Sequence, residues 1–414
     1  MTAFDHQSSD IRAGTAPEVR RRLVFYIPGF DPAPVRRYRE LYRREGAEQA
    51  HISGYHLGLT PGAGKTGWQV QAQIDGGPVQ SEVRLLVWSD IVRDRMGFGV
   101  AATYGLLLRT LWIYLSDGTL GRLLGLRKGP AIAIAYPVVI LLAELAMALL
   151  PGLGLVLTGR ALFGPAGGWG GLALGAIAAI ALLQFFRRHD GRIRAYWLMQ
   201  DYAWSARLRG AYPPELEQRL GQFVATLRAA LMEKVDEVLV VGHSSGAIWA
   251  ISVLADLMRA GLPAGHPPLG FLSLGQMVPM LSFLPEARRL RRDLHDLSQC
   301  ADLTWVDVTA PGDGCSFALC DPVAVSGVAP AEGKLWPLVL SCAFSQTLSP
   351  ERWNARRWRW FDLHFQYLQA FDRPGDYDYF RITAGPLTLA SRFRGRSASK
   401  SRIERPCSAH RTMT

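Results

Sequence analysis

A long, nearly uncharged stretch in the middle of the chain constrains the fold more than any other feature. Within residues 129–186 only Glu144 and Arg160 carry a charge. An α-helix needs about 20 apolar residues to cross about 30 Å of hydrocarbon, and this stretch holds two such runs. The sequence therefore predicts two membrane spans, at residues 130–150 and 167–186. They also account for the low share of charged residues, 20% of the chain.

The two predicted spans should pack together as an antiparallel hairpin. Gly167, Gly171 and Gly175 recur every four residues, so one face of the second span lacks side chains and admits a close neighbour. The connecting segment 151–165 is short and carries Arg160 as its only charge. Basic residues gather instead on the two outer flanks: Arg122, Arg127, Lys128, Arg187, Arg188, Arg192 and Arg194. The positive-inside rule then places both flanks in the cytoplasm.

A third apolar stretch, residues 97–115, contains Arg109. We expect an interfacial helix there, with a true span as the alternative. The reason is parity. Strand-like segments precede and follow the membrane insertion, residues 96–194, and they can join one sheet on one side of the bilayer only if the number of spans is even.

Outside the insertion, strand and helix patterns alternate. Apolar runs typical of strands occur at residues 23–27, 68–74, 83–88, 237–241, 269–274, 303–308 and 338–344. Amphipathic segments typical of helices occur at residues 35–49, 215–235 and 247–259. This order predicts an α/β fold with a mostly parallel sheet. The glycine-rich segment 58–67 has Leu59 where a phosphate-binding loop needs glycine, so we expect a plain connection there and no nucleotide.

The net charge of +11 does not indicate nucleic-acid binding, because its largest part sits at one end. Residues 391–414 hold seven Lys or Arg against one acid and supply +6. Their Ser, Arg and Gly content predicts a disordered, solvated tail, with contact to an anionic membrane surface as the functional alternative. The five cysteines have neither a disulfide framework nor zinc-site spacing, so we expect no metal and no cofactor.

The strongest chemical motif is G-x-S-x-G at residues 242–246. It starts where the apolar strand 237–241 ends and leads into the predicted helix 247–259. A sharp strand-to-helix turn of this kind exposes the hydroxyl of its central serine, Ser244, and the two glycines remove side chains that would clash. The motif therefore predicts a nucleophilic serine.

With this strand, turn and helix, the chain resembles the α/β-hydrolase superfamily over about residues 22–90 and 212–385. The resemblance implies a serine, an acid and a histidine in that chain order, acting on an acyl ester or amide. The turn after the second strand beyond the serine nominates Asp313 as the acid, with Asp321 and Asp307 as alternatives. Only His364 and His410 follow Asp313, and His410 lies in the predicted tail, so His364 is the expected base.

The resemblance also implies an oxyanion hole made of two backbone N–H groups. Ser245, the residue after the nucleophile, supplies one. The turn after strand 23–27 reads Pro28, Gly29, Phe30, and we expect Phe30 to supply the other, with Asp31 next to it. This turn departs from the His-Gly form common in lipases.

Together these features predict an α/β-hydrolase-like sheet interrupted by a transmembrane hairpin. We expect a polar segment without a secretory signal, a first part of the hydrolase domain, the membrane insertion, a second part with the catalytic residues, and the tail: residues 1–20, 21–95, 96–194, 195–390 and 391–414. The expected function is hydrolysis of a lipid or other amphiphilic acyl ester, by a domain on the cytoplasmic side of an inner or plasma membrane. A non-catalytic membrane receptor or scaffold is the alternative.

Overall fold

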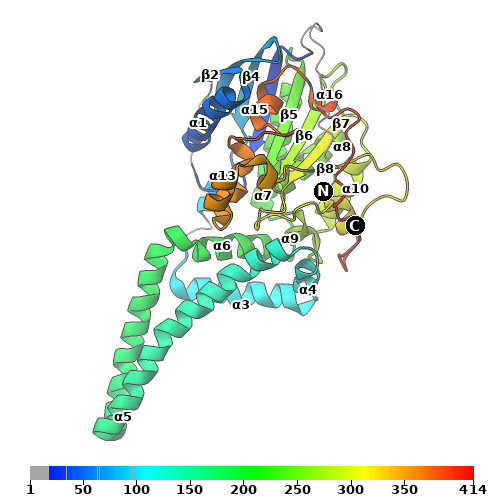
Figure 1. The fold of residues 1–414 in the computed structure, drawn as a ribbon. Coiled ribbons are helices and arrows are strands. Elements are labelled where there is room, and N and C mark those ends of the chain that lie inside the picture. The colour runs from blue at the N-terminus through cyan, green and yellow to red at the C-terminus, as the bar shows by residue number, and fades with distance from the viewer. Residues whose placement is uncertain (1–17, 34, 63, 65, 95–96) are drawn as a thin grey trace, which may run out of the picture.

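The computed structural model describes residues 18–33, 35–62, 64, 66–94 and 97–414. The prediction for residues 1–20 therefore lies almost entirely outside the described residues. The described chain forms a sheet domain, made of residues 18–88 and 207–414, and a helical insertion, made of residues 89–206. Figure 1 shows the insertion projecting from one end of the sheet domain.

One sheet of eight strands runs in the order β2-β3-β4-β1-β5-β6-β7-β8. Only β3 runs against the others, because the β2–β3 and β3–β4 pairs are antiparallel and the remaining pairs are parallel. The strands are β1 (Arg21–Ile27), β2 (His56–Pro61), β3 (Gly67–Ile74), β4 (Gly77–Leu85), β5 (Glu237–His243), β6 (Leu269–Leu274), β7 (Leu303–Thr309) and β8 (Leu338–Ser341). The predicted α/β class with a mostly parallel sheet is confirmed.

Both faces of the central strands β1, β5, β6 and β7 are buried, which is what apolar runs without alternation require. Phe25 and Trp305 point into one core with α7, α8 and α10. Their strand neighbours Tyr26 and Val306 point into a second core with α1 and α15. The helices of this domain are α1 (Val35–Ser53), α7 (Pro214–Ala230), α8 (Gly246–Arg259), α9 (Val278–Ser282), α10 (Arg288–Ser298), α11 (Pro322–Val325), α12 (Phe344–Thr347), α13 (Pro350–Arg356), α14 (Trp360–His364), α15 (Tyr379–Ala384) and α16 (Leu389–Arg392), with a 3₁₀ turn at Gln366–Leu368.

All seven predicted strands and all three predicted helices of the sheet domain are present. Two details differ. The strand predicted at residues 83–88 begins earlier, at Gly77, because it pairs with β3 across a tight turn at Asp75 and Gly76. The start of the glycine-rich segment belongs to β2, which pairs with β3 and was predicted as a connection. This segment forms a strand because it pairs with β3 at the edge of the sheet, and not because its residues form an apolar run.

The insertion consists of α2 (Ser89–Arg93), α3 (Val100–Ser116), α4 (Thr119–Leu124), α5 (Lys128–Ile193) and α6 (Ala195–Ala206). Helix α5 contains one long apolar segment, Ile132–Gly191, that is long and apolar enough to span a membrane; 28% of its most apolar window is buried. Helix geometry breaks within α5 at Gly164, where φ is 65° and ψ is −156°. Figure 1 shows α5 as two arms that fold back on each other.

Glycines join the two arms of α5. A Cβ on Gly159 would lie 2.3 Å from the carbonyl oxygen of Gly167, and a Cβ on Gly152 would lie 3.3 Å from that of Gly175. The arms therefore touch backbone to backbone, as the four-residue glycine spacing predicts. The segment 151–165, predicted as a loop, is helical except at Gly164, so the turn is tighter than the sequence suggests.

The apolar stretch predicted as an interfacial helix forms α3. It packs Leu107, Ile113 and Tyr114 inward, and its closest helical neighbour is α6. On its other face, Leu108 and Trp112 are 69% and 70% exposed. In Figure 1, α6 borders the sheet domain, and α3 lies on the side of α6 away from the sheet.

The prediction of a disordered tail is wrong. Residues 391–414 cross the sheet domain in a fixed path: Ile403 forms a parallel β-bridge with Cys320, and its N–H donates to the carbonyl of Leu319 at 2.7 Å. The guanidinium of Arg291 donates to the carbonyl of Thr412 at 2.8 Å. The tail is anchored through its backbone groups. Side-chain composition does not reveal such contacts, so the polar composition of the tail did not indicate that it is ordered.

Candidate active site

Ser244 occupies the tight turn between β5 and α8. Its φ is 59°, a left-handed conformation that non-glycine residues rarely adopt. The flanking glycines are necessary here. A Cβ on Gly246 would lie 2.1 Å from the carbonyl oxygen of Ile27, and one on Gly242 would lie 2.6 Å from Ala247 Cα. The chain therefore has the sharp strand-to-helix turn that the motif predicts.

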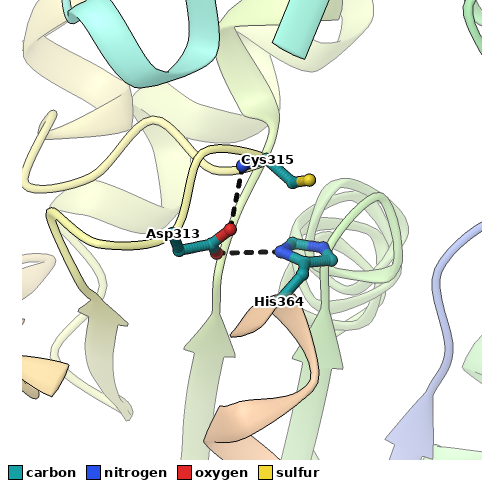
Figure 2. Close-up of side chains that lie close together, drawn as sticks. All are labelled: Asp313, Cys315 and His364. Carbon is teal, nitrogen blue, oxygen red and sulfur yellow. Dashed lines mark hydrogen bonds and ion pairs between the residues drawn. The ribbon is translucent and has the colours of Figure 1, made fainter. Parts of the chain in front are cut away.

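Asp313 and His364 come together from two distant parts of the chain. Asp313 follows β7, and His364 ends α14. His364 Nδ1 lies 2.8 Å from Asp313 Oδ2, and the same oxygen accepts a hydrogen bond from Tyr367 Oη at 2.9 Å. The other oxygen accepts from the Cys315 N–H at 2.9 Å (Figure 2). Three donors thus hold one fully buried carboxylate in a single orientation.

These contacts determine the charge of Asp313. Burial by itself raises the pKa of a carboxyl group, but the nearby imidazole of His364 and the hydrogen bonds from His364, Cys315 and Tyr367 outweigh it, and the pKa of Asp313 lies below its ordinary value. Asp313 is therefore ionised at neutral pH. An ionised acceptor at Nδ1 keeps the proton of neutral His364 on Nδ1 and leaves Nε2 free to accept one.

Ser244 and His364 line the same cavity, of about 250 Å³. His364 Nε2 is buried and has no hydrogen-bond partner among the described residues. The hydroxyl of Ser244 donates to Met277 Sδ at 3.3 Å and not to His364. The structure thus brings Asp313 and His364 into contact and places Ser244 in their cavity, with its hydroxyl turned to a neighbouring thioether.

The two expected oxyanion donors also lie at Ser244. Gly29 approaches so closely that a Cβ on it would stand 2.9 Å from Ser244 Cβ, so the turn that carries Phe30 packs against the serine. Within the described part of the chain, neither the Phe30 N–H nor the Ser245 N–H has a hydrogen-bond partner. Asp31, by contrast, uses its N–H in a tight turn to the Gly29 carbonyl at 2.7 Å.

The other acids considered have different partners. Asp307 is buried in β7, accepts from Ser273 Oγ at 2.6 Å, and has its pKa raised to about 8 by burial. Asp321 caps α11 and forms an ion pair with Lys334. Neither is a recorded partner of His364, and His410 lies 3.3 Å from Asp117.

Sequence reasoning missed His243, the residue before the nucleophile. Its Nε2 lies 2.8 Å from the backbone carbonyl of His364. Burial, followed by the neighbouring His364, lowers the pKa of His243 to about 3, so its ring is neutral and its Nε2 carries the proton that this hydrogen bond needs. His243 thereby ties α14 to β5. The one sequence feature that could have indicated His243 was its position within the G-x-S-x-G motif. No sequence feature indicated Tyr367, which donates a hydrogen bond to Asp313.

Among the residues that the structure describes, Asp313, Cys315 and His364 have ligand atoms that cluster closely enough, within 4.8 Å, to hold a metal ion. Their chemistry does not favour one. His364 Nδ1 is already bonded to Asp313, and Cys315 meets Asp313 through its backbone N–H and not through sulfur. Burial, then the charges of Asp313 and Asp201, raise the pKa of the Cys315 thiol, so the thiolate that a metal requires is disfavoured.

The cavity has two walls from different parts of the chain. Loops of the sheet domain supply one wall, including Gly29, Phe30, Ser244 and His364. The insertion supplies the other, from the end of α5 and from α6: Asp190, Gly191, Arg194, Trp197, Leu198, Asp201 and Tyr202. The helices next to the apolar arms therefore form part of the site itself.

No family model, curated protein or solved structure matches this chain. The functional assignment consequently depends on the geometry of the cavity and on the chemistry that its residues support.

Proposed function

We propose that the protein is a membrane-anchored serine hydrolase with an α/β-hydrolase-like sheet, and that it cleaves an acyl ester. The observation that carries the proposal is the cavity that Ser244, held at φ 59° on a strand-to-helix turn, shares with a histidine already oriented by an ionised acid. A structural turn has no need of a strained serine next to an unpaired imidazole nitrogen and two unpaired N–H groups.

The reaction begins with a rotation of Ser244 about χ1, from Met277 to His364 Nε2. The imidazole takes the hydroxyl proton as Oγ attacks the ester carbonyl, and the N–H groups of Phe30 and Ser245 stabilise the oxyanion. The imidazolium, stabilised by Asp313, then protonates the leaving alcohol. Water repeats the sequence on the acyl-enzyme and releases the acid, which restores the serine.

The apolar surface supports a membrane position. Large hydrophobic side chains are exposed along both arms of α5, among them Leu150, Phe163, Trp169 and Ile177 at 65–75%. Exposed apolar surface of this extent is costly in water and favourable in lipid. We infer that the arms form a transmembrane hairpin and that α3 lies at the interface. The basic flanks support a cytoplasmic position for the sheet domain, at an inner or plasma membrane.

The position of the cavity supports an amphiphilic substrate. Helix α6 and the end of α5 form one wall of the site, so the site lies where the insertion meets the sheet domain. The lining is largely apolar, with Phe30, Trp197, Met277 and Phe361 around the serine. An acyl chain entering from the bilayer would bury its surface there.

A fluorophosphonate probe tests the proposal in detergent-solubilised protein. The wild type and Ser245→Ala should be labelled, because Ser245 acts through its backbone, whereas Ser244→Ala should not. Equal loss in both serine variants, with folding intact by circular dichroism, would argue against this nucleophile. Absence of labelling in the wild type would favour the second candidate, a non-catalytic receptor or scaffold, to which the hydrogen bond between Ser244 and Met277 gives some support.

A further inference from the structure

A second groove, rich in arginine, adjoins the catalytic cavity. It has a volume of about 540 Å³ and is lined in part by Arg36, Arg37, Arg44 and Arg194. Arg37 and Arg194 also line the catalytic cavity, so they stand at the boundary between the two. They come from the start of α1 and from the junction of α5 and α6, which are more than 150 residues apart.

The groove carries an excess of positive charge. Its two acids are each paired with an arginine that is not among the groove residues: Glu40 with Arg43 at 2.5 Å and Asp362 with Arg359 at 2.6 Å. Among the described residues, Arg36 has no ion pair. The same holds for Arg194, which instead lies 5.1 Å from the centre of the Phe361 ring.

The remaining two arginines are only weakly neutralised. Arg37 lies 3.8 Å from Asp31 Oδ2, an oxygen that already accepts a hydrogen bond from Tyr38 Oη at 2.8 Å. Arg44 pairs with Glu45 at 2.8 Å but is 66% exposed. Guanidinium groups of this kind offer planar, bidentate donors that match phosphate oxygens.

The catalytic cavity itself has a different character. Its acids have other partners or are uncharged. Asp190 accepts from the N–H groups of Tyr196 and Trp197 at 3.0 and 3.2 Å, and burial raises the pKa of Asp201 to about 8. An apolar, nearly neutral cavity at the serine therefore opens beside a cationic groove. Such a pair of sites fits a molecule with an acyl ester at one end and an anion at the other.

We propose that the arginine groove binds the phosphate group of an acyl-ester substrate whose ester lies at Ser244. The substrate class is then a phosphate-bearing amphiphile, such as an acidic lysophospholipid. This inference rests on the proposed hydrolase function. The groove lies at the junction of the sheet domain and the insertion, which is the level at which lipid phosphates would meet a protein anchored through α5.

Two soluble esters test the groove apart from any membrane effect: glycerol phosphate monobutyrate and glycerol monobutyrate. The double variant Arg36→Gln/Arg44→Gln, at two groove arginines that do not line the catalytic cavity, should lose roughly tenfold or more in kcat/KM for the phosphate ester, because charge-assisted hydrogen bonds to phosphate are lost. It should retain its activity on the neutral ester. Arg39→Gln, on the same helix but lining neither cavity, is the matched control.

Equal losses on both esters, or no loss on either, would overturn the groove proposal. So would an effect seen only with long-chain substrates in vesicles, because membrane charge would then be the cause. Calorimetric binding of glycerol phosphate monobutyrate to Ser244→Ala, with and without the two α1 substitutions, separates the two proposals. Arginine-dependent binding without turnover in the wild type would uphold the groove and refute the hydrolase; turnover without arginine-dependent binding would do the reverse.

Discussion

Replacing Asp313 by asparagine tests the charge arrangement around His364. The amide nitrogen must take the place of one carboxylate oxygen. At Oδ1 it would face the N–H of Cys315, a backbone donor that cannot change. At Oδ2 it would face His364 Nδ1 and Tyr367 Oη, which can both reorganise. The second arrangement is therefore favoured, and His364 then carries its proton on Nε2. A protonated Nε2 cannot accept the proton of Ser244.

The expected loss is large. An imidazole in the wrong tautomer removes general-base catalysis, and we expect kcat to fall by about four orders of magnitude, or about 5.5 kcal/mol of transition-state stabilisation. Hydrolysis of a p-nitrophenyl ester in detergent measures it, with circular dichroism to confirm folding. Because the pKa of Asp313 is lowered, the stability it supplies is present above about pH 4 and is lost only as the pH falls through its folded pKa.

Asp307→Asn is the matched control for this variant. Asp307 is equally buried and lies in β7, the strand that leads into the same loop, but its pKa of about 8 means that it is largely protonated at neutral pH. Exchange of a neutral carboxyl for an amide should leave kcat within a few-fold of the wild type. The reasoning fails if Asp313→Asn stays within tenfold of the wild type while folded, or if Asp307→Asn is as damaging.

Three further variants examine the surroundings of the site. His243→Phe leaves the buried carbonyl of His364 without its donor; it should lower the free energy of unfolding by about 1–3 kcal/mol and reduce kcat more than KM changes, as chemical denaturation and steady-state kinetics would report. Because the pKa of Asp201 is raised to about 8 by burial, its contribution makes the protein less stable as the pH rises from about 4 to about 8; Asp201→Asn should flatten this decline in the thermal midpoint measured in detergent. Cys315→Ser should keep most of the activity, and a chelator should leave the wild type unchanged, whereas loss in both would indicate a metal at Asp313 and His364.

Much of the sheet could be predicted because its strands are buried on both faces. A run such as Val238 to Val241 has no polar position, and only a central strand accepts that pattern. The turn at Ser244 was predictable for a similar reason, since its neighbours require glycine. The pairing of Asp313 with His364 followed from chain order, which the α/β-hydrolase resemblance supplied.

What escaped prediction depends on contacts without a local signal. Strand β2 exists through edge pairing with β3, and its own residues are half exposed or exposed. The tail is held by backbone groups, such as the Ile403 N–H on the Leu319 carbonyl, which any composition could supply. The bond from His243 to the His364 carbonyl joins positions 121 residues apart and is visible only once the sheet is assembled.

The remaining prediction concerns topology. Strands β4 and β5, which precede and follow the insertion, both pair with β1, so the chain must leave and re-enter the same side of any membrane that it crosses. Under the proposed topology, Phe163, 75% exposed next to the break at Gly164, lies across the membrane from the sheet domain, and Met232, 73% exposed after α7, lies on the cytoplasmic side. In a cysteine-free background, Phe163→Cys should react with a membrane-impermeant maleimide added to intact cells. Met232→Cys should react only after permeabilisation. The opposite pattern would mean that the basic flanks face outward, and no reaction of Phe163→Cys from outside, with both positions labelled after permeabilisation, would mean that the α5 arms do not cross the bilayer.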